Sequence, residues 1–395
     1  MNPRPRLLFY VQHLLGIGHV QRAARLAAGW CRAGIDVAVV CGGEPVAGVD
    51  YGTARCHQLP PLRAADAGFS ALVDRHGEPP DAEFKARRRE QLLQLLAAEQ
   101  PQLLVIESYP FGRRQLRWEL QPLLQAADRQ RPRPLILCSL RDILQRRRPQ
   151  RVAESLALSQ RYMDHLLVHG DPAFIALESS LPEIRAQAHK LIYTGYVANP
   201  ALPDYQGAYH PARGDGRLGE VLVSAGGGAV GYRLLQTALA ARALSPLGRH
   251  PWRLLVGPNL PPEQLRQLRR QADGGVTIEP LREDFPDLLS RAALSISQGG
   301  YNTLMDLLGV GCPALLVPFE GAGETEQLTR CQRLQQLGMI TLLREQQLTP
   351  AALATAIEAE LARPGARVNL NCAGVDSSAR QLLALCRAPQ ADRHG

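Results

Sequence analysis

Lysine is almost absent from this chain, and so are paired metal ligands and long apolar runs. Only Lys85 and Lys190 are lysines, so 43 of the 45 Lys and Arg residues are arginine, which weakens any mechanism that needs a catalytic or phosphate-binding lysine. The eight cysteines form no C-x-x-C pair, so we expect no metal site. No stretch approaches the ~18 apolar residues of a membrane span. Residues 1–15 lack a signal-peptide cleavage site, and we therefore expect a cytoplasmic protein.

The composition is that of a globular protein with more than one domain. The chain has 395 residues, of which 45% are hydrophobic and 21% charged, with a net charge of +8. Basic runs at 85–89, 113–114 and 146–148 are ordinarily solvated helix faces. The alternative is an acceptor-binding domain that meets anionic lipid head groups. Nucleic-acid binding is not expected, because there is no recognisable reading helix or aromatic platform.

The first half of the chain alternates short apolar runs with helical spacing. The expected strands are 6–11, 35–40, 103–106, 135–137, 166–168 and 191–193, and the expected helices are 20–32, 81–99 and 115–128. Strands that alternate with helices of this length predict a parallel sheet covered on both faces.

The alternation of expected strands and helices stops between residues 198 and 219, a segment rich in Pro, Gly and polar residues, and resumes after it. The second set of expected strands is 220–225, 252–256, 276–278, 294–296 and 314–317, with a helix over 231–244. We predict the α/β class, with two Rossmann-like, doubly wound domains facing a cleft. They are an N-terminal domain over 1–200, a linker over 201–219 and a C-terminal domain over 220–395, whose last helix has the option of packing back on the first domain.

A glycine loop follows the first strand of the second half. Its residues 226–231 fit both G-x-G-x-x-G and the spacing of a P-loop, but Tyr232 and Arg233 stand where a P-loop has Lys and Ser or Thr. Nucleoside triphosphate hydrolysis is therefore not expected. The dinucleotide interpretation needs a carboxylate after the next strand, where residues 257–259 offer none. What remains is phosphate binding by exposed backbone N–H groups, or a tight turn alone.

The strongest signal is the segment 297–330, which reads as strand, Gly-Gly turn, helix, turn, strand, polar loop and helix. Gly299 and Gly300 would let the backbone approach a ligand and leave helix N-terminal amides for a diphosphate. Asn302 and Thr303 would add donors or cap the helix. One turn later Asp306 could hold ribose hydroxyls, while Glu326 and Gln327 at the next helix suit sugar hydroxyls.

The pattern G-G-x-x-T…(D/E)…G-x-P…P…(D/E)-Q resembles the donor-binding signature of glycosyltransferases of the GT-B fold. The most similar type is the group containing the lipid-linked N-acetylglucosaminyltransferase of peptidoglycan synthesis. Further stretches resemble a bacterial family of predicted glycosyltransferases: QHLLGIGHVQRA, ESYPFGRRQL, SLRDIL, LVHGDPAF with LES, YTGYV and GGYNT. The resemblance spans nearly the whole chain and implies a fold and a reaction class but no particular substrate.

The resemblance implies that the C-terminal domain binds a nucleotide sugar and the N-terminal domain the acceptor. Matched by position, the donor-binding residues are Gly16, Gly18, Ser224, Gly226, Gly227, Gly228, Phe285, Gly299, Gly300, Asn302, Thr303, Asp306, Glu326 and Gln327. Among them Ser224 and the glycine loop would meet the diphosphate, Asp306 the ribose, and the segment from Leu281 to Phe285 the base. Two departures concern the donor: Gln298 precedes the first glycine, and Arg330 replaces an asparagine common in relatives.

Sugar transfer with inversion needs a base for the acceptor hydroxyl, and imidazole suits this role near neutral pH. His19 follows the first strand, where similar enzymes place such a histidine, and Glu107 ends the strand 103–106, where several relatives place its carboxylate partner. A His19–Glu107 dyad is our hypothesis. The alternative is that His19 caps its helix and Glu107 is a solvated carboxylate. Arg113, Arg141 and Asp142 are candidate acceptor contacts, with a salt-linked turn at Arg141 and Asp142 as the alternative.

Three functions follow from these patterns. The first is an inverting glycosyltransferase, with a UDP-sugar favoured as donor and a lipid-linked or anionic hydroxyl acceptor, acting in cell-envelope or polysaccharide synthesis with peripheral contact at the inner membrane face. It would need no cofactor and no metal, because the chain has no Asp-x-Asp triplet of the GT-A type. The second is a nucleotide-sugar epimerase or hydrolase on the same fold. The third is a non-catalytic nucleotide-sugar-binding protein.

Overall fold

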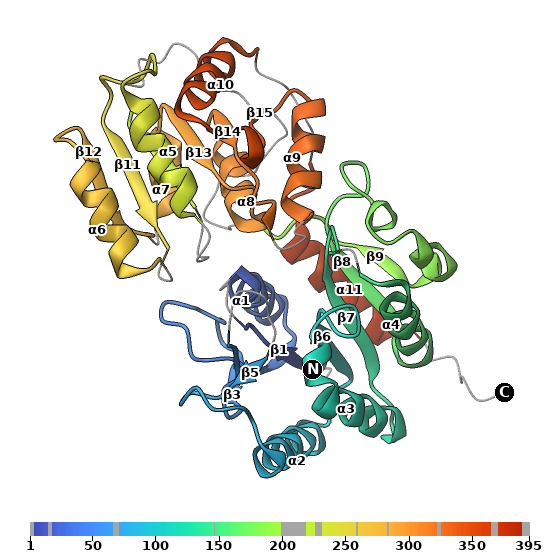
Figure 1. The fold of residues 1–395 in the computed structure, drawn as a ribbon. Helices are drawn as coiled ribbons and strands as arrows, with labels where there is room; N and C mark the ends of the chain where they lie inside the picture. Colours follow the sequence, from blue (N-terminus) through green and yellow to red (C-terminus); the bar gives the residue numbers. More distant parts are fainter. Residues whose placement is uncertain are drawn as a thin grey trace. The chain divides into compact units, whose positions relative to one another are not determined.

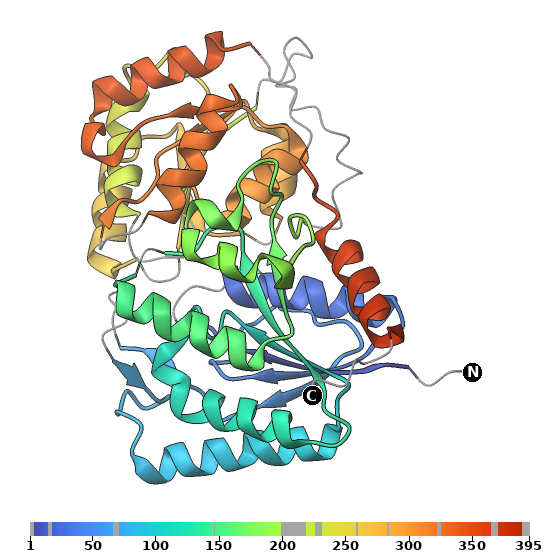
Figure 2. The same ribbon diagram turned by 90° about the vertical axis from the view of Figure 1, so that its right-hand side faces the viewer.

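The computed structural model describes residues 4–14, 18–65, 71–145, 147–198, 219–225, 231–257, 260–282, 284–321, 325–364 and 370–388. Contacts divide the chain into two compact units, Met1–Val197 with Asn371–Gly395, and Ala198–Leu370. Figures 1 and 2 show the elements of each unit from two sides. The predicted class, α/β with two doubly wound parallel sheets, is confirmed by the strand orders.

The first unit is built on a parallel sheet in the order β3-β2-β1-β6-β7-β8-β9. Its strands are β1 (Arg6–Val11), β2 (Asp36–Cys41), β3 (Arg55–Gln58), β6 (Leu103–Glu107), β7 (Leu135–Arg141), β8 (His165–His169) and β9 (Leu191–Tyr193). A short antiparallel pair, β4 (Arg63–Ala64) and β5 (Leu72–Val73), was not expected. From β1 the chain first adds β2 and β3 on one side of the sheet and then returns to add β6 to β9 on the other side of β1. Ligands bind at such a switch point, here between β1 and β6.

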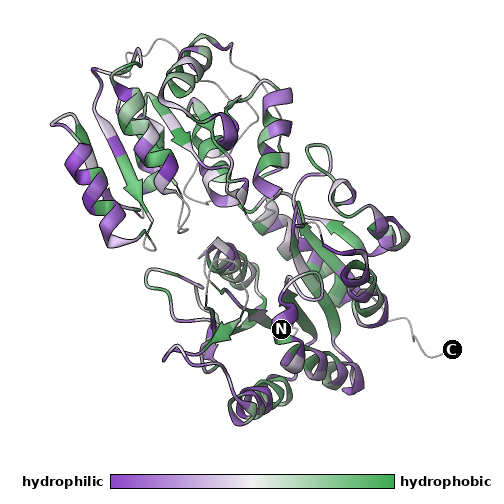
Figure 3. Cartoon of the chain, in the orientation of Figure 1, coloured by the Kyte–Doolittle hydropathy of each residue, from purple (hydrophilic) through white to green (hydrophobic). Residues whose placement is uncertain are grey.

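Apolar residues cover both faces of this sheet. One core combines Leu8 and Tyr10 of β1 with residues of α2 (Ala82–Glu99) and α3 (Arg117–Arg129). The other combines Leu7 and Phe9 with residues of α1 (Gly18–Arg32) and α11 (Gly374–Arg387). Helix α4 (Pro149–Tyr162) packs on the first core. Figure 3 shows the apolar strands and the polar outer sides of the helices. Burial on both faces explains why β1 reads as an unbroken apolar run.

Helix α11 belongs to the first unit although it ends the chain. Trp30 of α1 donates from Nε1 to Oγ of Ser378 at 2.9 Å. Gly29 lets the two helices approach, since a Cβ there would lie 2.0 Å from Cγ1 of Val375. The predicted C-terminal domain included residues 371–395, with packing of the last helix on the first domain as an option. The contacts group Asn371–Gly395 with the first unit.

The second unit repeats the architecture with a parallel sheet in the order β12-β11-β10-β13-β14-β15. The strands are β10 (Val221–Ser224), β11 (Trp252–Val256), β12 (Val276–Pro280), β13 (Leu294–Ser297), β14 (Ala314–Leu316) and β15 (Thr341–Leu342). The helices are α5 (Tyr232–Arg242), α6 (Pro262–Gln271), α7 (Phe285–Arg291), α8 (Tyr301–Val310), α9 (Glu326–Gln336) and α10 (Pro350–Ala362). The order reverses between β10 and β13, which puts their ends at the switch point.

One arginine of the basic run 85–89 lies in the core, which corrects its interpretation as a wholly solvated face. Arg88 of α2 is fully buried, and its Nε donates to Oε2 of Glu119 in α3 at 2.7 Å. Oε1 of the same carboxylate accepts from the hydroxyl of Tyr10 at 2.5 Å. Nη2 of Arg88 donates to Oε1 of Gln12 at 2.8 Å. This buried cluster ties two helices to β1.

We expect Arg88→Met to lower the free energy of unfolding by about 3–5 kcal/mol, because it leaves the Glu119 carboxylate buried without its cation. The measurement is amide hydrogen exchange of the β1 backbone. Arg87→Met is the matched control: Arg87 is exposed, its distance to Glu83 is 3.9 Å, and its loss should cost less than about 0.5 kcal/mol. Equal effects of the two variants would contradict the assignment. Adding Glu119→Leu to Arg88→Met should recover most of the loss.

Candidate active site

The structure brings His19 and Glu107 into direct contact. Gly18 and His19 open α1 after β1, and Glu107 ends the neighbouring strand β6. Nδ1 of His19 lies 2.5 Å from Oε1 of Glu107. With Glu107 ionised, Nδ1 carries the proton and donates it, which leaves a lone pair on Nε2. The predicted Gly16 lies outside the described residues.

Glu107 is fully buried, and four groups stabilise its charge. Besides His19, Oε1 accepts from Nη2 of Arg22 at 2.9 Å and from Oγ of Ser108 at 2.7 Å. Oε2 accepts from Nη2 of Arg113 at 3.2 Å. Burial by itself raises the pKa of this carboxyl, but its interaction with His19 and the charges of Arg113 and Arg22 outweigh this effect and hold the pKa well below its usual range. Glu107 is therefore a permanent anion, and the alternative of a solvated carboxylate is wrong.

The loop after β6 has an unusual backbone that brings two of these donors to one carboxylate. Ser108 has φ 65° and Arg113 has φ 57°, both in the left-handed region that non-glycine residues rarely adopt. Gly112 donates its N–H to the carbonyl of Ser108 at 2.6 Å, and a Cβ on Gly112 would lie 2.9 Å from Cβ of Ser108. Strain of about 1 kcal/mol or more at each position is typical of functional sites. The loop thereby directs Ser108 and Arg113 at Glu107.

Sequence reasoning missed Arg22 and Ser108. Arg22 lies three residues after His19 on the same side of α1 and is buried. An arginine among the apolar residues Val20, Ala23 and Ala24 was the signal that could have found it. Arg113 forms an ion pair with Glu107, and its role as an acceptor contact stays a prediction.

Arg141 lies against the other nitrogen of His19. It ends β7, the strand beside β6, and its Nη2 donates to Nε2 of His19. Burial lowers the pKa of His19 well below its usual value and the charge of Arg141 lowers it further, while Glu107 raises it without reversing the shift. The imidazole is thus neutral at physiological pH. Its side chain is 18% exposed, so a substrate can reach it.

Asp142 has a structural role. It is fully buried, and its oxygens accept from the hydroxyl of Tyr196 at 3.0 Å and from the backbone N–H of Ile143 at 3.0 Å. These bonds hold the turn after β7. Its prediction as an acceptor contact is therefore corrected, because the carboxylate does not face solvent.

A hollow of about 360 Å³ lies on the two loops that carry Glu107 and Arg141. Its lining includes Phe111 from the loop after β6, Leu144 and Arg147 from the segment after β7, and Val152 and Ser155 from α4. Ser155 also donates to the carbonyl of Pro110 at 2.9 Å, which fixes α4 to the first of these loops. The hollow combines apolar side chains with the polar or charged side chains of Gln145, Arg147, Ser155, Ser180 and Glu183. Arg146 of the basic run 146–148 lies outside the described residues.

In the second unit, the predicted donor residues gather at the ends of β10 and β13. Ser224 is paired with Ser297, and Gln298 donates its N–H to the carbonyl of Ser224 at 3.1 Å. Ser224 is buried. The predicted Gly226, Gly227 and Gly228 lie outside the described residues.

The two glycines of the Gly-Gly turn have different surroundings. A Cβ on Gly299 would lie 2.3 Å from Sγ of Cys331 in α9, so this glycine lets the turn pack against that helix. Gly300 is the N-cap of α8, and a Cβ there would find only Oγ1 of Thr303, at 3.9 Å. Gly300 is thus the one of the pair with space beside it.

The remaining turn residues sit inside or around α8. Asn302 and Thr303 lie in its first turn, and its N-cap residue, Gly300, has no side chain; capping by Asn302 or Thr303 stays an alternative. Asp306 is buried one turn later. Phe285 was expected on a loop, but it is the buried first residue of α7. Leu281 donates its N–H to the carbonyl of Val256 at 2.9 Å, so its backbone extends the sheet.

Helix α9 braces the same turn. Arg330, which departs from the asparagine of relatives, is buried; its Nη1 donates to the carbonyl of Gly299 at 3.4 Å, and its guanidinium lies 5.7 Å from the ring centre of Tyr301. Gln327 accepts the backbone N–H of Phe319 at 3.1 Å through Oε1. Glu326 is the first residue of α9 and is half-buried.

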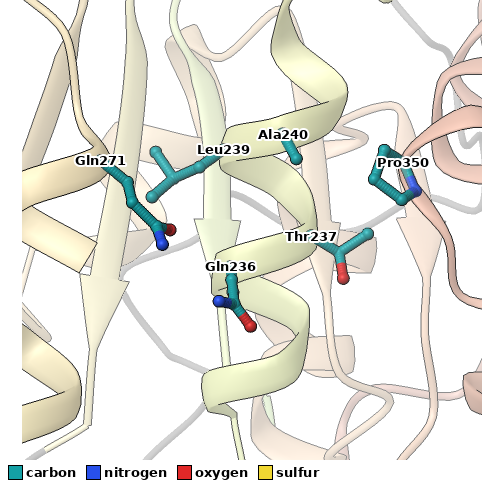
Figure 4. Close-up of a pocket in the computed structure, with 6 residues that line it drawn as sticks. All are labelled: Gln236, Thr237, Leu239, Ala240, Gln271 and Pro350. Atoms are coloured by element: carbon teal, nitrogen blue, oxygen red, sulfur yellow. The ribbon is translucent and has the colours of Figure 1, made fainter. Parts of the chain in front are cut away.

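Another hollow, of about 430 Å³, lies in the helix layer of the second unit (Figure 4). Gln236 and Thr237 on α5, Gln271 at the end of α6 and Pro350 at the start of α10 line it. None of the predicted site residues lines it, so it is not part of the candidate active site.

Two kinds of feature are absent from the described residues. No described helix has the length and apolar character needed to cross a membrane. No three His, Cys, Asp or Glu side chains among these residues are grouped as metal ligands.

Residues 222–371 match the model of the glycosyltransferase family 28 C-terminal domain. This part of the chain is similar to such a domain, and we refer to it as the family 28 domain. It contains the turn at Gly299 and Gly300 and both helices that hold it.

Among the curated relatives are two enzymes of one kind. The UDP-N-acetylglucosamine–N-acetylmuramyl-(pentapeptide) pyrophosphoryl-undecaprenol N-acetylglucosamine transferases of Paramagnetospirillum magneticum and Rhodopseudomonas palustris (strain BisB18) are each 30% identical, over 46% and 50% of this chain. The matched region spans about half the length of these relatives, 49% and 54%.

Solved structures show the fold. The glycosyltransferase of kitacinnamycin has a TM-score of 0.59 at 15% identity and covers 97% of this chain and 96% of its own. MurG of Acinetobacter baumannii has a TM-score of 0.56 at 15% identity, with 97% and 99% covered. The UDP-GlcNAc 2-epimerase of Methanocaldococcus jannaschii has a TM-score of 0.59 at 12% identity, with 96% and 99% covered. The chain therefore has the GT-B fold that the family 28 domain implies.

We expect Gly299→Ala to destabilise the family 28 domain by about 1–3 kcal/mol, because its methyl group meets Cys331. Gly300→Ala should change stability by less than about 0.5 kcal/mol, since Gly300 has φ −65° and open space. Hydrogen exchange of β13 amides measures both. Cys331→Ala should restore part of the stability lost in Gly299→Ala, and similar losses in the two glycine variants would refute this distinction.

Proposed function

We propose that this protein is an inverting, metal-independent glycosyltransferase that moves a sugar from a UDP-sugar to an acceptor hydroxyl. The observation that carries the proposal is the His19–Glu107 pair, a neutral imidazole held by a buried anion, in a chain that contains a family 28 domain. The family 28 domain would bind the donor, and the first unit would supply the base.

The proposed reaction accounts for each bond that forms or breaks and for the proton that is transferred. The acceptor oxygen attacks the anomeric carbon of the donor while Nε2 of His19 takes the hydroxyl proton. The bond from the anomeric carbon to the diphosphate oxygen breaks, and the diphosphate leaves with the electron pair. Attack opposite the leaving group inverts the anomeric centre. The imidazolium that forms is stabilised by Glu107, as in other triad-like arrangements.

The diphosphate would be stabilised at the start of α8. Backbone N–H groups at a helix N-terminus bind anions, and the helix dipole favours negative charge there. Gly300 presents no side chain at this point. Asp306 would hold the ribose, and Glu326 with Gln327 the sugar; for Gln327 this requires release of its bond to Phe319. Preorganised amides can replace a metal ion in this role.

The acceptor is proposed to be lipid-linked. The relatives named above act on a pyrophosphoryl-undecaprenol substrate, and the hollow lined by Phe111, Leu144 and Val152 has the apolar character that part of such a molecule would need. A lipid-linked acceptor would place the protein as a peripheral enzyme at the inner face of the membrane.

An epimerase is the second candidate, because the UDP-GlcNAc 2-epimerase of M. jannaschii shares the fold. Product analysis separates the two: an epimerase changes the sugar nucleotide without acceptor, whereas a transferase releases UDP only with one.

UDP should raise the melting temperature of the protein, and GDP and dTDP should raise it less. Gly300→Ala should weaken UDP binding by roughly tenfold with little change in stability, because a methyl group obstructs the diphosphate. Thermal shift and calorimetry with UDP measure this, in parallel with the exposed variant Arg266→Gln. If none of the three nucleotides changes the melting temperature of the wild-type protein, the donor assignment is wrong.

His19→Ala should lower kcat by about 10²–10⁴-fold, the usual contribution of a general base. Transfer from labelled UDP-N-acetylglucosamine into a bacterial membrane lipid extract, in the presence of EDTA, measures it, with Arg114→Gln as the control. Since only neutral His19 accepts the proton and its pKa is lowered, kcat/KM should stay level well below pH 6.5 and fall only at more acid pH. Full activity of His19→Ala, or loss of all activity with EDTA, would contradict the mechanism.

A further inference from the structure

His13 lies at the same edge of the first sheet as the His19–Glu107 pair but takes no part in the proton transfer. It follows the end of β1 by two residues, and β1 and β6 are neighbours. Burial and the charge of Arg113 lower its pKa, and Glu107 raises it without reversing the shift. The ring is therefore neutral at physiological pH, and the two charged groups that act on it also act on His19.

Buried Gln12 fixes the backbone of His13. Its Nε2 donates to the carbonyl of His13 at 2.7 Å and to that of Leu62 at 3.0 Å. Its Oε1 accepts from Nη2 of Arg88 at 2.8 Å, so the buried cluster of Arg88 and Glu119 holds the chain at this point. The position of His13 is thus set before any ligand binds, which lowers the entropic cost of a contact with it.

The ring of His13 packs against the backbone of Gly43, two residues after the end of β2. A Cβ on Gly43 would lie 2.4 Å from Nδ1 and 2.5 Å from Cε1 of His13, so glycine leaves the room that the imidazole occupies. Within the described part of the chain, no hydrogen bond or ion pair reaches either ring nitrogen. This half-buried imidazole is held in place and has a donor and an acceptor available to a ligand.

We propose that His13 is a specificity-determining residue that hydrogen-bonds an uncharged hydroxyl or amide group of the acceptor, beside the hydroxyl that His19 deprotonates. The inference rests on the proposed function and deepens it. A neutral imidazole carries one N–H donor and one lone pair, which complement a hydroxyl or an amide. The acceptor brings its reacting hydroxyl to His19, and His13 belongs to the same unit and is subject to the charge of the same carboxylate.

A contact of this kind selects among acceptors. A molecule that displaces water from His13 without offering a polar group leaves the ring nitrogens without a hydrogen bond, and this weakens its binding. No bond that forms or breaks at the anomeric carbon involves His13. The side chain therefore affects how strongly the acceptor binds, and the proton transfer remains the task of His19.

His13→Phe keeps an aromatic ring over Gly43 and removes both nitrogens. Transfer from labelled UDP-N-acetylglucosamine into a bacterial membrane lipid extract measures its effect in the full-length protein. The apparent KM for the extract should rise roughly tenfold while kcat changes by less than about threefold, the pattern of a lost binding contact. His13→Asn and His13→Gln place an amide near Nδ1 and Nε2, and one of them should recover part of the loss. His76→Phe, at an exposed histidine of the same unit, should behave as wild type.

Gly43→Ala tests the same contact while His13 is unchanged. Its methyl group would displace the imidazole, so the apparent KM for the extract should rise here as well. In a His13→Ala protein, where the ring is gone, Gly43→Ala should add little to the loss. Calorimetry should show the wild-type affinity for UDP in each of these variants, because the contact is assigned to the acceptor.

Three outcomes would overturn the proposal. They are an unchanged apparent KM in His13→Phe, a loss of UDP affinity in that variant, which would assign His13 to the donor, and no recovery in either amide variant, which would leave the ring a packing role. A wild-type protein that releases no UDP in the presence of the extract refutes the proposed function, and this inference falls with it. UDP-dependent transfer that is insensitive to His13 removes only this inference.

Discussion

A carboxylate buried between apolar strands is stable only when cations and hydrogen-bond donors surround it, and Glu107 meets that condition with four side chains. Two come from α1 and two from the loop that follows β6. The need to satisfy this one charge explains the left-handed backbone at Ser108 and Arg113 and the buried Arg22. It also fixes the tautomer of His19, so the geometry of the base depends on an electrostatic requirement of the core.

The first unit contains a second buried ion pair, Arg88 with Glu119, whose role is structural. Arg88 and Glu119 join α2 and α3 to β1 through Tyr10, at the opposite face of the sheet from α1. With one face held by this cluster and the other by α1 and α11, the ends of β1, β6 and β7 form a rigid support for the site. In the family 28 domain, Arg330 has the comparable task of bracing the turn at Gly299.

The two units contribute different kinds of support to the proposed function. The family match and the turn before α8 indicate a donor site of a known type. The first unit would add a base with its orienting anion, which a protein that only bound nucleotide sugars would not require.

The sequence by itself determined the two parallel sheets and the Gly-Gly turn, for which period and glycine position suffice. The His19–Glu107 pair was a hypothesis drawn from the resemblance, and the tertiary structure brings the two side chains together because β1 and β6 are neighbours in the sheet. The tertiary structure decided which charged residues are buried and which atoms they meet. Arg88 reads as part of a surface run, Asp142 as a cleft carboxylate and α11 as part of the C-terminal half. Each depends on contacts between residues far apart in the chain, such as Arg88 with Glu119, Asp142 with Tyr196 and Trp30 with Ser378, and such contacts leave no periodic trace in the sequence.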